Sequence, residues 1–238
     1  MKKKRKIILI SALCVLAFAV TAVSLALLGR QKTDSRSGGV REISVVMDNN
    51  YPPYVFYDEA GNLQGILIDQ WKLWEEKTGI HVALSAMDWA TAQDVMKNGR
   101  FDVIDTAFYN EERDAWLDFS KPYVTINVPV FHDNRIGGIT DVKSLHGFLV
   151  AVKEGDACID VLKKAGVTDV AEYSSYEAII DAVRGGKVRV FVMDEPPALY
   201  YLYKTGLASR FSGGLSIYSG EFHRAVAEGD TETLQLVE

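Results

Sequence analysis

Cysteine and histidine are scarce in this chain. Its 238 residues include two cysteines and four histidines. Cys14 lies in an apolar stretch near the amino end, so Cys158 is alone in the rest of the chain and cannot form an internal disulfide there. A lone cysteine in a short apolar stretch is usually a small buried hydrophobic residue. The histidines lack the spacing of zinc ligands. The sequence therefore indicates neither a disulfide scaffold nor a metal site, and we expect no cofactor.

Catalytic motifs and basic residues are also few. The chain has no glycine-rich phosphate loop and no Gly-x-Ser-x-Gly turn, and Cys158 has no obvious histidine partner. Residues 1–41 contain nine of the 26 Lys and Arg residues and one of the 32 Asp and Glu residues. The remaining chain therefore has 17 bases against 31 acids, an excess of 14 negative charges. This excess argues against nucleic acid as a partner.

One long uncharged run lies near the amino end. Residues 7–28 follow a basic cluster at residues 2–6 and carry no charge. At about 1.5 Å per helical residue the run reaches about 33 Å, enough to cross a bilayer. The preceding basic charges favour a cytoplasmic amino end, which places the chain after Gly29 outside the cytoplasm. The segment 1–29 is either a signal peptide or a membrane anchor. Residues 30–41 are predicted to be a flexible linker.

The rest of the chain alternates strand-like and helix-like patterns, which predicts an α/β fold. The expected strands are Ile43–Met47, Val82–Met87, Phe101–Asp105, Leu149–Lys153, Asp169–Glu172 and Val188–Met193. The expected helices are Leu67–Thr78, Trp89–Asn98, Ala157–Ala165, Tyr176–Arg184, Pro197–Lys204 and Thr231–Glu238. A long β-branched stretch, Val124–Phe131, separates two such series, which favours two lobes rather than one continuous sheet. We expect lobe 1 to comprise residues 42–128 and 215–238, and lobe 2 residues 129–214.

Ligands of parallel α/β sheets bind at the carboxyl ends of the strands. The candidate ligand-binding residues at these ends are Asp48, Tyr51, Trp89, Thr106, Phe108, Arg113, Asp156, Ala157 and Asp194. A guanidinium can hold a carboxylate with two hydrogen bonds, and an aspartate can accept hydrogen bonds from an ammonium group. Aromatic faces cover apolar parts and attract cations. This set of side chains suits a small zwitterion or cation.

Several candidates also have a structural interpretation. An aspartate before a helix is more often an N-cap than a ligand contact. Arg113 lies in the sequence Asn-Glu-Glu-Arg-Asp and could pair with its acidic neighbours on a solvated turn. Tyr51 and Trp89 could be core residues. Asp194, however, follows an apolar run and lies at the tip of a buried strand, where a carboxylate is more often functional.

The ordered motifs resemble those of the bacterial extracellular solute-binding proteins of family 3, the polar amino-acid receptors of ABC importers. The matching segments are Gly61–Asp69, Gly99–Asp102, Glu112-Arg113 with Leu117–Tyr123, and Gly185–Asp194. The resemblance runs from about Ile43 to Glu238. Each motif is weak alone, but their common order makes the resemblance specific.

The resemblance implies a bilobal periplasmic-binding-protein fold of type II, with two α/β lobes joined by two hinge strands. One hinge would be Val124–Phe131 and the other would lie near Leu215–Gly220. By position, Arg113 matches the arginine that grips the ligand carboxylate. Asp194 matches the aspartate that accepts from the α-amino group, and Tyr51 matches an aromatic residue that covers the ligand.

The chain departs from the family pattern at two of these positions. Phe108 stands where many receptors have serine or threonine, and Asp156 stands near a usual threonine. Asp105 is expected to add another acid near the site. These departures leave the identity of the ligand open.

The segments Met193–Leu202 and Gly220–Val226 also resemble versions of the family that are fused to membrane sensors. The expected partners are therefore a small amino acid, amine or carboxylate, and either an ABC permease or a fused or associated signalling module. An alternative is a dehydratase that uses Asp156 or Asp194 for proton transfer on a small carboxylate.

Overall fold

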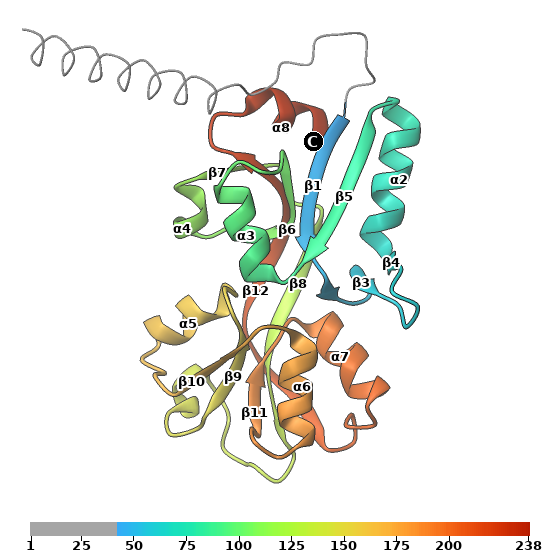
Figure 1. Cartoon of the computed structure of the whole chain (residues 1–238). Coiled ribbons are helices and arrows are strands. Elements are labelled where there is room, and N and C mark those ends of the chain that lie inside the picture. The colour runs from blue at the N-terminus through green and yellow to red at the C-terminus, as the bar shows by residue number, and fades with distance from the viewer. Residues whose placement is uncertain (1–41) are drawn as a thin grey trace, which may run out of the picture. The chain divides into compact units, whose positions relative to one another are not determined.

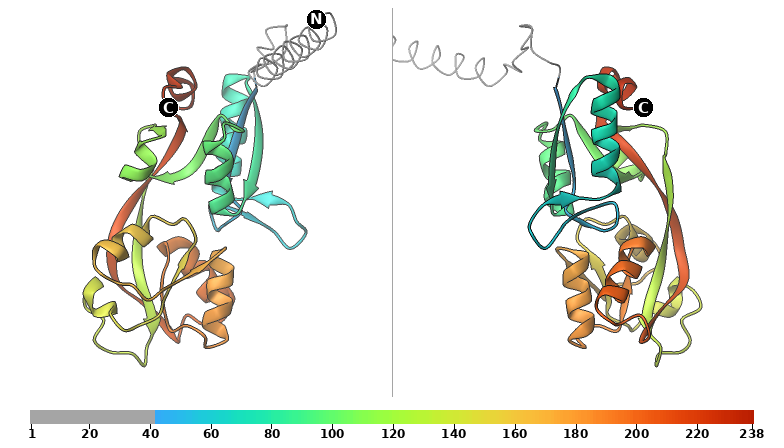
Figure 2. Two further views of the ribbon diagram at one scale, coloured as in Figure 1. Left: turned by 60° about the vertical axis from the view of Figure 1, so that its left-hand side comes forward. Right: turned by 90° about the vertical axis from the view of Figure 1, so that its right-hand side faces the viewer.

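The computed structural model describes residues 42–238, whose helices and strands gather into two groups (Figures 1 and 2). We call the first group lobe 1: β1 (Glu42–Asp48), β2 (Asn50–Tyr51), β3 (Val55–Tyr57), β4 (Leu63–Gln64), α2 (Ile66–Thr78), β5 (His81–Met87), α3 (Trp89–Lys97), β6 (Val103–Phe108), α4 (Glu111–Asp114), β7 (Leu117–Phe119) and α8 (Thr231–Val237). Lobe 2 holds η1 (Val142–Leu145), β9 (Val150–Lys153), α5 (Cys158–Lys164), β10 (Val170–Tyr173), α6 (Tyr176–Arg184), β11 (Val190–Val192) and α7 (Glu195–Lys204).

Two long strands, β8 (Val124–Asp133) and β12 (Phe211–Ala227), pass through both lobes (Figure 1). They pair antiparallel with each other along most of β8. In lobe 2, β8 also pairs with β11, and in lobe 1, β12 pairs with β6 and β7. The expectation of two separate sheets is therefore wrong. Within residues 42–238, nine strands form one sheet in the order β10-β9-β11-β8-β12-β6-β1-β5, with β7 also paired to β12, because β8 pairs with β11 of lobe 2 and with β12, which in turn pairs with β6 of lobe 1. A separate three-stranded sheet holds β2, β3 and β4.

The proposed lobe boundaries, at residues 128/129 and 214/215, fall inside these two hinge strands. The second hinge is longer than the sequence indicated. Gly213 and Gly214, which precede the expected hinge segment, both lie within β12, which has register shifts between Gly213 and Tyr218. A Cβ atom on Gly213 would lie 3.0 Å from the Phe131 ring, so the absent side chain lets the two hinge strands pack closely.

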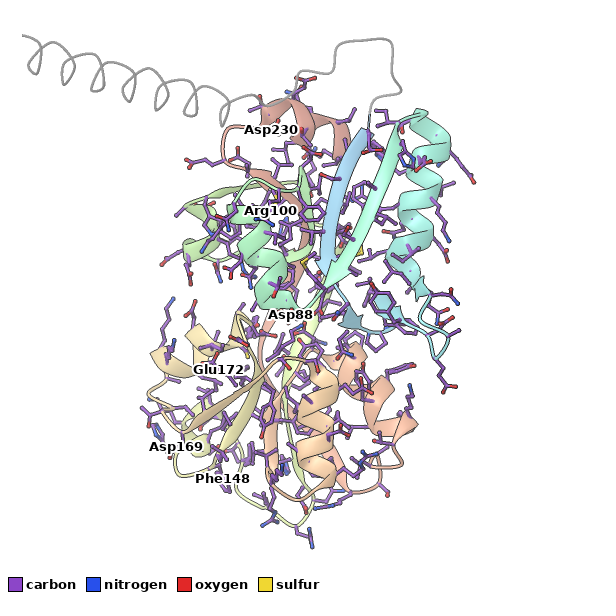
Figure 3. The ribbon with its side chains drawn as sticks, in the orientation of Figure 1. Asp88, Arg100, Phe148, Asp169, Glu172 and Asp230 are labelled. Atoms are coloured by element: carbon purple, nitrogen blue, oxygen red, sulfur yellow. The ribbon has the colours of Figure 1, made fainter. Side chains whose placement is uncertain are left out.

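The parallel strands place the site. In lobe 1, β1 lies between β5 and β6, and in lobe 2, β9 lies between β10 and β11, all parallel within their lobe. In both lobes the chain leaves these strands on the side that faces the other lobe. Figure 3 labels Asp88, which follows β5, and Glu172, in β10, at these facing sides, whereas Phe148 and Asp169 lie at the far end of lobe 2.

The predicted helix Leu67–Thr78 is confirmed as α2 and shows why its pattern is helical. Trp71 is fully buried and Trp74 packs against it, with 5.6 Å between the ring centroids. Gly65 precedes the helix with a positive φ of 130°. A Cβ atom there would lie 2.2 Å from the carbonyl oxygen of Tyr54, so this motif position requires glycine.

The structure describes no residue before Glu42, so the proposed leader or anchor at residues 1–29 and the linker at residues 30–41 lie outside it. Within residues 42–238, no helix has both the length and the apolar character needed to span a bilayer.

Candidate ligand cleft

A small cavity lies between the two lobes. Its lining contains all nine candidate residues, Asp48, Tyr51, Trp89, Thr106, Phe108, Arg113, Asp156, Ala157 and Asp194, together with Lys153 and Tyr176. Most of the lining side chains come from the carboxyl ends of β1, β6, β9 and β11 and from the starts of α3, α5 and α6, while Tyr51 comes from β2 and Arg113 from α4. The cavity measures about 20 Å³, which is room for about one water molecule. The lining side chains therefore leave little free space in this central cavity.

Arg113 reaches into this cavity from α4, whose start is capped by Asn110. Its side chain is buried, and its hydrogen bonds go away from the acids of its own helix. Nη1 donates to the carbonyl oxygen of Phe108 at 2.8 Å, and Nη2 donates to that of Gly155 at 3.0 Å. The guanidinium lies over the Trp89 ring, 5.2 Å from its centroid. Burial lowers the pKa of Arg113 from its usual value. The interpretation as a solvated surface pair is therefore wrong.

Asp194 occupies the N-cap position of α7, but its side chain makes no capping hydrogen bond. Its Oδ2 accepts from the Tyr51 hydroxyl, and its Oδ1 is buried without a hydrogen-bond partner among residues 42–238. Burial raises the pKa of Asp194 to about 7, and the negative charge of Asp156 adds to the shift. The hydrogen bond from Tyr51 and the charge of Lys153 oppose it. A buried carboxylate oxygen without a donor is the kind of group that binds an ammonium.

Sequence reasoning missed Lys153. Its side chain is 3% exposed and forms an ion pair across the lobes with Asp48, which is 2% exposed. The ammonium lies over the face of the Tyr176 ring, 3.8 Å from its centroid. Lys153 is the last residue of β9. This is the same kind of position as that of Asp48 at the end of β1 and Phe108 at the end of β6.

Asp156 lies just before α5 and faces Tyr176. Tyr176 is the second lining residue that sequence reasoning missed. The Tyr176 hydroxyl donates to Asp156 Oδ2 at 2.9 Å, and the backbone N–H of Cys158 donates to Oδ1 at 3.0 Å. Cys158 itself is 1% exposed, and burial raises the pKa of its thiol well above the usual value. The prediction that Cys158 is a small buried residue is confirmed. Ala157 offers the cavity only its methyl group and backbone.

Phe108 and Thr106 come from the end of β6. The Phe108 ring packs against Phe222, with 5.2 Å between the ring centroids. A Cβ atom on Gly220 would lie 2.3 Å from the Phe108 ring. Phe108 thus closes the cavity toward the hinge. Thr106 has a φ of 63°, and its hydroxyl donates to the carbonyl oxygen of Asp105 at 2.6 Å.

Asp105 does not line the cavity, so its placement near the ligand site is wrong. Its carboxylate is fully buried inside lobe 1. It accepts hydrogen bonds from Trp71 Nε1 at 2.7 Å, from the Tyr123 hydroxyl at 2.6 Å and from the Thr106 N–H at 2.7 Å. Because three donors of lobe 1 satisfy this carboxylate, Asp105 has a structural role within the lobe.

The carbonyl oxygen of Gly155, in lobe 2, accepts three donors from lobe 1. These are Trp89 Nε1 and Gln93 Nε2, both at 3.2 Å, and Arg113 Nη2. On another side of the cavity, Asn50 donates to the Tyr201 hydroxyl at 2.7 Å and accepts from the backbone N–H of Glu177 at 2.9 Å. The lobes are therefore bridged at these two places, by the Tyr51–Asp194 hydrogen bond and by the central ion pair.

Comparison with known proteins identifies the family. The model of the bacterial extracellular solute-binding proteins, family 3, matches residues 43–238. The chain belongs to this family. The sequence resemblance and the bilobal periplasmic-binding-protein fold are thereby confirmed.

Among curated relatives of this family member, a putative amino-acid ABC transporter-binding protein, PatH of Vibrio harveyi, is 26% identical over 72% of this chain and 70% of the relative. The virulence sensor protein BvgS of Bordetella pertussis is 23% identical over 82% of this chain. The chain spans only 16% of that sensor's length. A solved ancestral arginine-binding protein bound to arginine superposes with a TM-score of 0.75 at 26% identity, covering 82% of this chain and 88% of the other.

Proposed function

We propose that this chain is an extracytoplasmic solute-binding domain that closes on a small amino acid. The observation that supports this proposal most directly is that two buried, oppositely charged side chains from different lobes line the same cavity. Arg113 comes from lobe 1 and Asp194 from lobe 2, and one oxygen of Asp194 has no donor among the described residues. In this account the guanidinium binds the ligand carboxylate, and Asp194 Oδ1 accepts from the ligand ammonium.

The remaining lining residues shape the space around these two groups. The rings of Tyr51 and Trp89 cover the ligand, and Thr106, Phe108 and Ala157 bound it. Asp48 and Asp156 add negative charge. Because β8 and β12 are the long connections between the lobes, they are the elements that would bend when the lobes open and close. Closure would bury the ligand and assemble contacts from both lobes.

Whether closure leads to transport or to signalling depends on the partner protein that detects the closed lobes. The relatives reported above include a protein named for an ABC transporter and a virulence sensor. We propose that the domain serves either an importer permease or a fused or associated signalling module, with residues 1–29 acting as signal peptide or membrane anchor. A reading frame that continues past Glu238 into a membrane span would select the sensor, and neighbouring permease genes would select the importer.

A carboxyl group with a pKa near 7 also suits acid–base catalysis, which favours the dehydratase as a second candidate. In that case Asp194 or Asp156 would transfer a proton on a bound carboxylate. The relatives reported above are named as binding and sensor proteins, which supports binding without turnover.

A ligand screen tests the proposed function. The purified chain is heated with single amino acids, amines and small carboxylates, since a ligand that binds only the native state raises the melting temperature. We expect an amino acid to give the largest shift and to be recovered unchanged. A shift produced only by amines without a carboxylate, or by carboxylates without an amine, would contradict the proposal. Conversion of a carboxylate to a dehydrated product would support the enzyme instead.

A further inference from the structure

The ammonium of Lys153 has the surroundings expected of a bound ligand cation. It pairs with the Asp48 carboxylate and lies over three aromatic rings. The ring centroids of Tyr176, Tyr51 and Trp89 are 3.8, 5.3 and 6.0 Å from Nζ. A carboxylate surrounded by aromatic faces is an environment that proteins use to bind organic cations. Here the cation belongs to the protein.

Lys153 also connects the lobes at the centre of the cleft. It extends from β9 in lobe 2, whereas Asp48 ends β1 in lobe 1. Both side chains are almost completely buried, and the remaining cavity holds about one water molecule. A ligand side chain that approached Asp48 would therefore meet the lysine already in place. Because the lysine is tethered, it competes at a high effective concentration.

We propose that Lys153 is a tethered cation that fills the cation position of the cleft, so that it holds the lobes together without ligand and excludes ligands with a basic side chain. This inference rests on the proposed function, in which Arg113 and Asp194 bind the α-carboxylate and α-ammonium. The ligand class that fits is a small amino acid with a neutral side chain. The fold relative solved with arginine does not set the specificity of this chain.

The energetic reason is the penalty for separating a buried ion pair. A basic side chain that took Asp48 would leave the Lys153 ammonium buried without its partner, and breaking a buried pair in this way is strongly unfavourable. A small neutral side chain leaves the pair intact. We therefore expect the protein to bind alanine-sized amino acids roughly 100-fold more tightly than arginine or lysine.

Binding measurements on Lys153→Met test the specificity. Methionine keeps much of the lysine's length but removes the charge, and Lys164→Met at an exposed position of lobe 2 is the matched control. Calorimetric titration should show that Lys153→Met improves arginine binding relative to alanine binding by at least about tenfold, whereas the control leaves the ratio unchanged. Equal binding of arginine and alanine by the unaltered protein, or an unchanged ratio in Lys153→Met, would overturn the proposal.

A distance measurement tests the bridging role without any ligand. Spin labels on cysteines that replace the exposed Lys72 and Lys187 report the separation of the lobes in the full chain, with Cys14 replaced by serine. We expect Lys153→Met to shift the distances to longer values. Asp48→Asn, which removes the partner from the other lobe, should shift them in the same direction even if Lys153→Met folds poorly. Unchanged distances in both variants would refute the bridge.

The two measurements separate this inference from the proposed function. If no amino acid binds but both variants lengthen the distances, the proposed function fails and the bridge by Lys153 stands. If a neutral amino acid binds through Arg113 and Asp194 but the arginine-to-alanine ratio is the same in Lys153→Met, the proposed function stands and the exclusion by Lys153 fails.

Discussion

The hydroxyl of Tyr51 in lobe 1 donates a hydrogen bond to Asp194 Oδ2 in lobe 2, while Asp194 Oδ1 has no donor among the described residues. One oxygen of the carboxylate therefore joins the lobes, and the other is the oxygen that we propose accepts from a ligand ammonium. Because the contact crosses the cleft, it forms only when the lobes are close together. In the proposed function, closure and recognition of the amine thus depend on the same carboxylate.

The raised pKa of Asp194 predicts that ligand binding depends on pH. Its pKa is about 7, so the carboxylate takes up a proton as the pH falls below 7 and can no longer accept two hydrogen bonds. Affinity for an amino acid should therefore fall by up to about tenfold per pH unit below 7. Titration calorimetry between pH 5.5 and 8, chosen as roughly 1 to 1.5 units either side of that pKa, measures this change. A flat profile would contradict the role of Asp194.

The Asp194 carboxyl group should also make the free energy of unfolding depend on pH. Its contribution to stability should fall as the pH rises, whereas its contribution to ligand affinity should increase. A carboxyl group whose pKa is raised in the native state stabilises that state most at low pH, and this contribution is lost as the pH rises from its usual pKa to about 7. Asp156, Tyr51, Lys153 and Tyr176 are the groups whose charge or hydrogen bonds act on it. Chemical denaturation of the ligand-free protein between pH 5 and 8, a window of roughly 3 units around the raised pKa, should show Asp194→Asn losing less stability with rising pH than the unaltered protein.

Replacement of Tyr51 by phenylalanine should lower the stability that the Asp194 contact provides and change the pH dependence of ligand binding. The change keeps the ring but removes the donor to Oδ2, which leaves a buried carboxylate with one bond fewer. We expect the free energy of unfolding to fall by about 1–3 kcal/mol at pH 8. The pH midpoint of ligand binding should move upward, because the lost hydrogen bond had lowered the pKa of Asp194. An unchanged midpoint would show that Tyr51 does not control this carboxylate.

Asp105→Asn should lower stability without changing ligand affinity. The buried carboxylate accepts from three donors inside lobe 1, and an asparagine amide would turn an N–H group toward at least one of them. We expect a loss of about 1–3 kcal/mol in the free energy of unfolding. The dissociation constant for the amino acid, measured well below the melting temperature, should stay within about twofold. A large loss of affinity would mean that Asp105 belongs to the ligand site after all.

Much of the fold was predictable from local patterns. The helix Tyr176–Arg184 has the predicted bounds, and the other expected helices and strands are found within a few residues of theirs. The second hinge was only partly recognised, because the expected segment near Leu215–Gly220 is the middle of the longer strand β12. Glycines in an extended strand carry no local signal of the partner strand, whose Phe131 ring lies against Gly213. The continuous sheet follows from that long-range pairing.

The site was predictable where strand ends carry unusual residues, as at Arg113 and Asp194. The sequence could not show that the Asp194 side chain makes no cap hydrogen bond, since this depends on Tyr51 from the other lobe. It also could not separate Asp105 from the ligand site, because the donors of Asp105 lie 34 and 18 residues away in the chain. Lys153 was missed because lysine at a strand end usually faces solvent, whereas here Asp48 of the other lobe buries it.

The central claim is that Arg113 and Asp194 each recognise a different group of one ligand. Its most direct test is a calorimetric comparison of the preferred amino acid with its analogue lacking the amino group and with its analogue lacking the carboxylate. Arg100→Ala and Asp169→Ala, at exposed positions labelled in Figure 3, serve as controls that should bind normally. In the unaltered protein, removal of either ligand group should weaken binding roughly 30-fold or more. Asp194→Ala should abolish the preference for ligands with the amino group but keep the preference for the carboxylate. Arg113→Ala should abolish the preference for the carboxylate but keep the preference for the amino group. The account is contradicted if both variants keep both preferences at full strength.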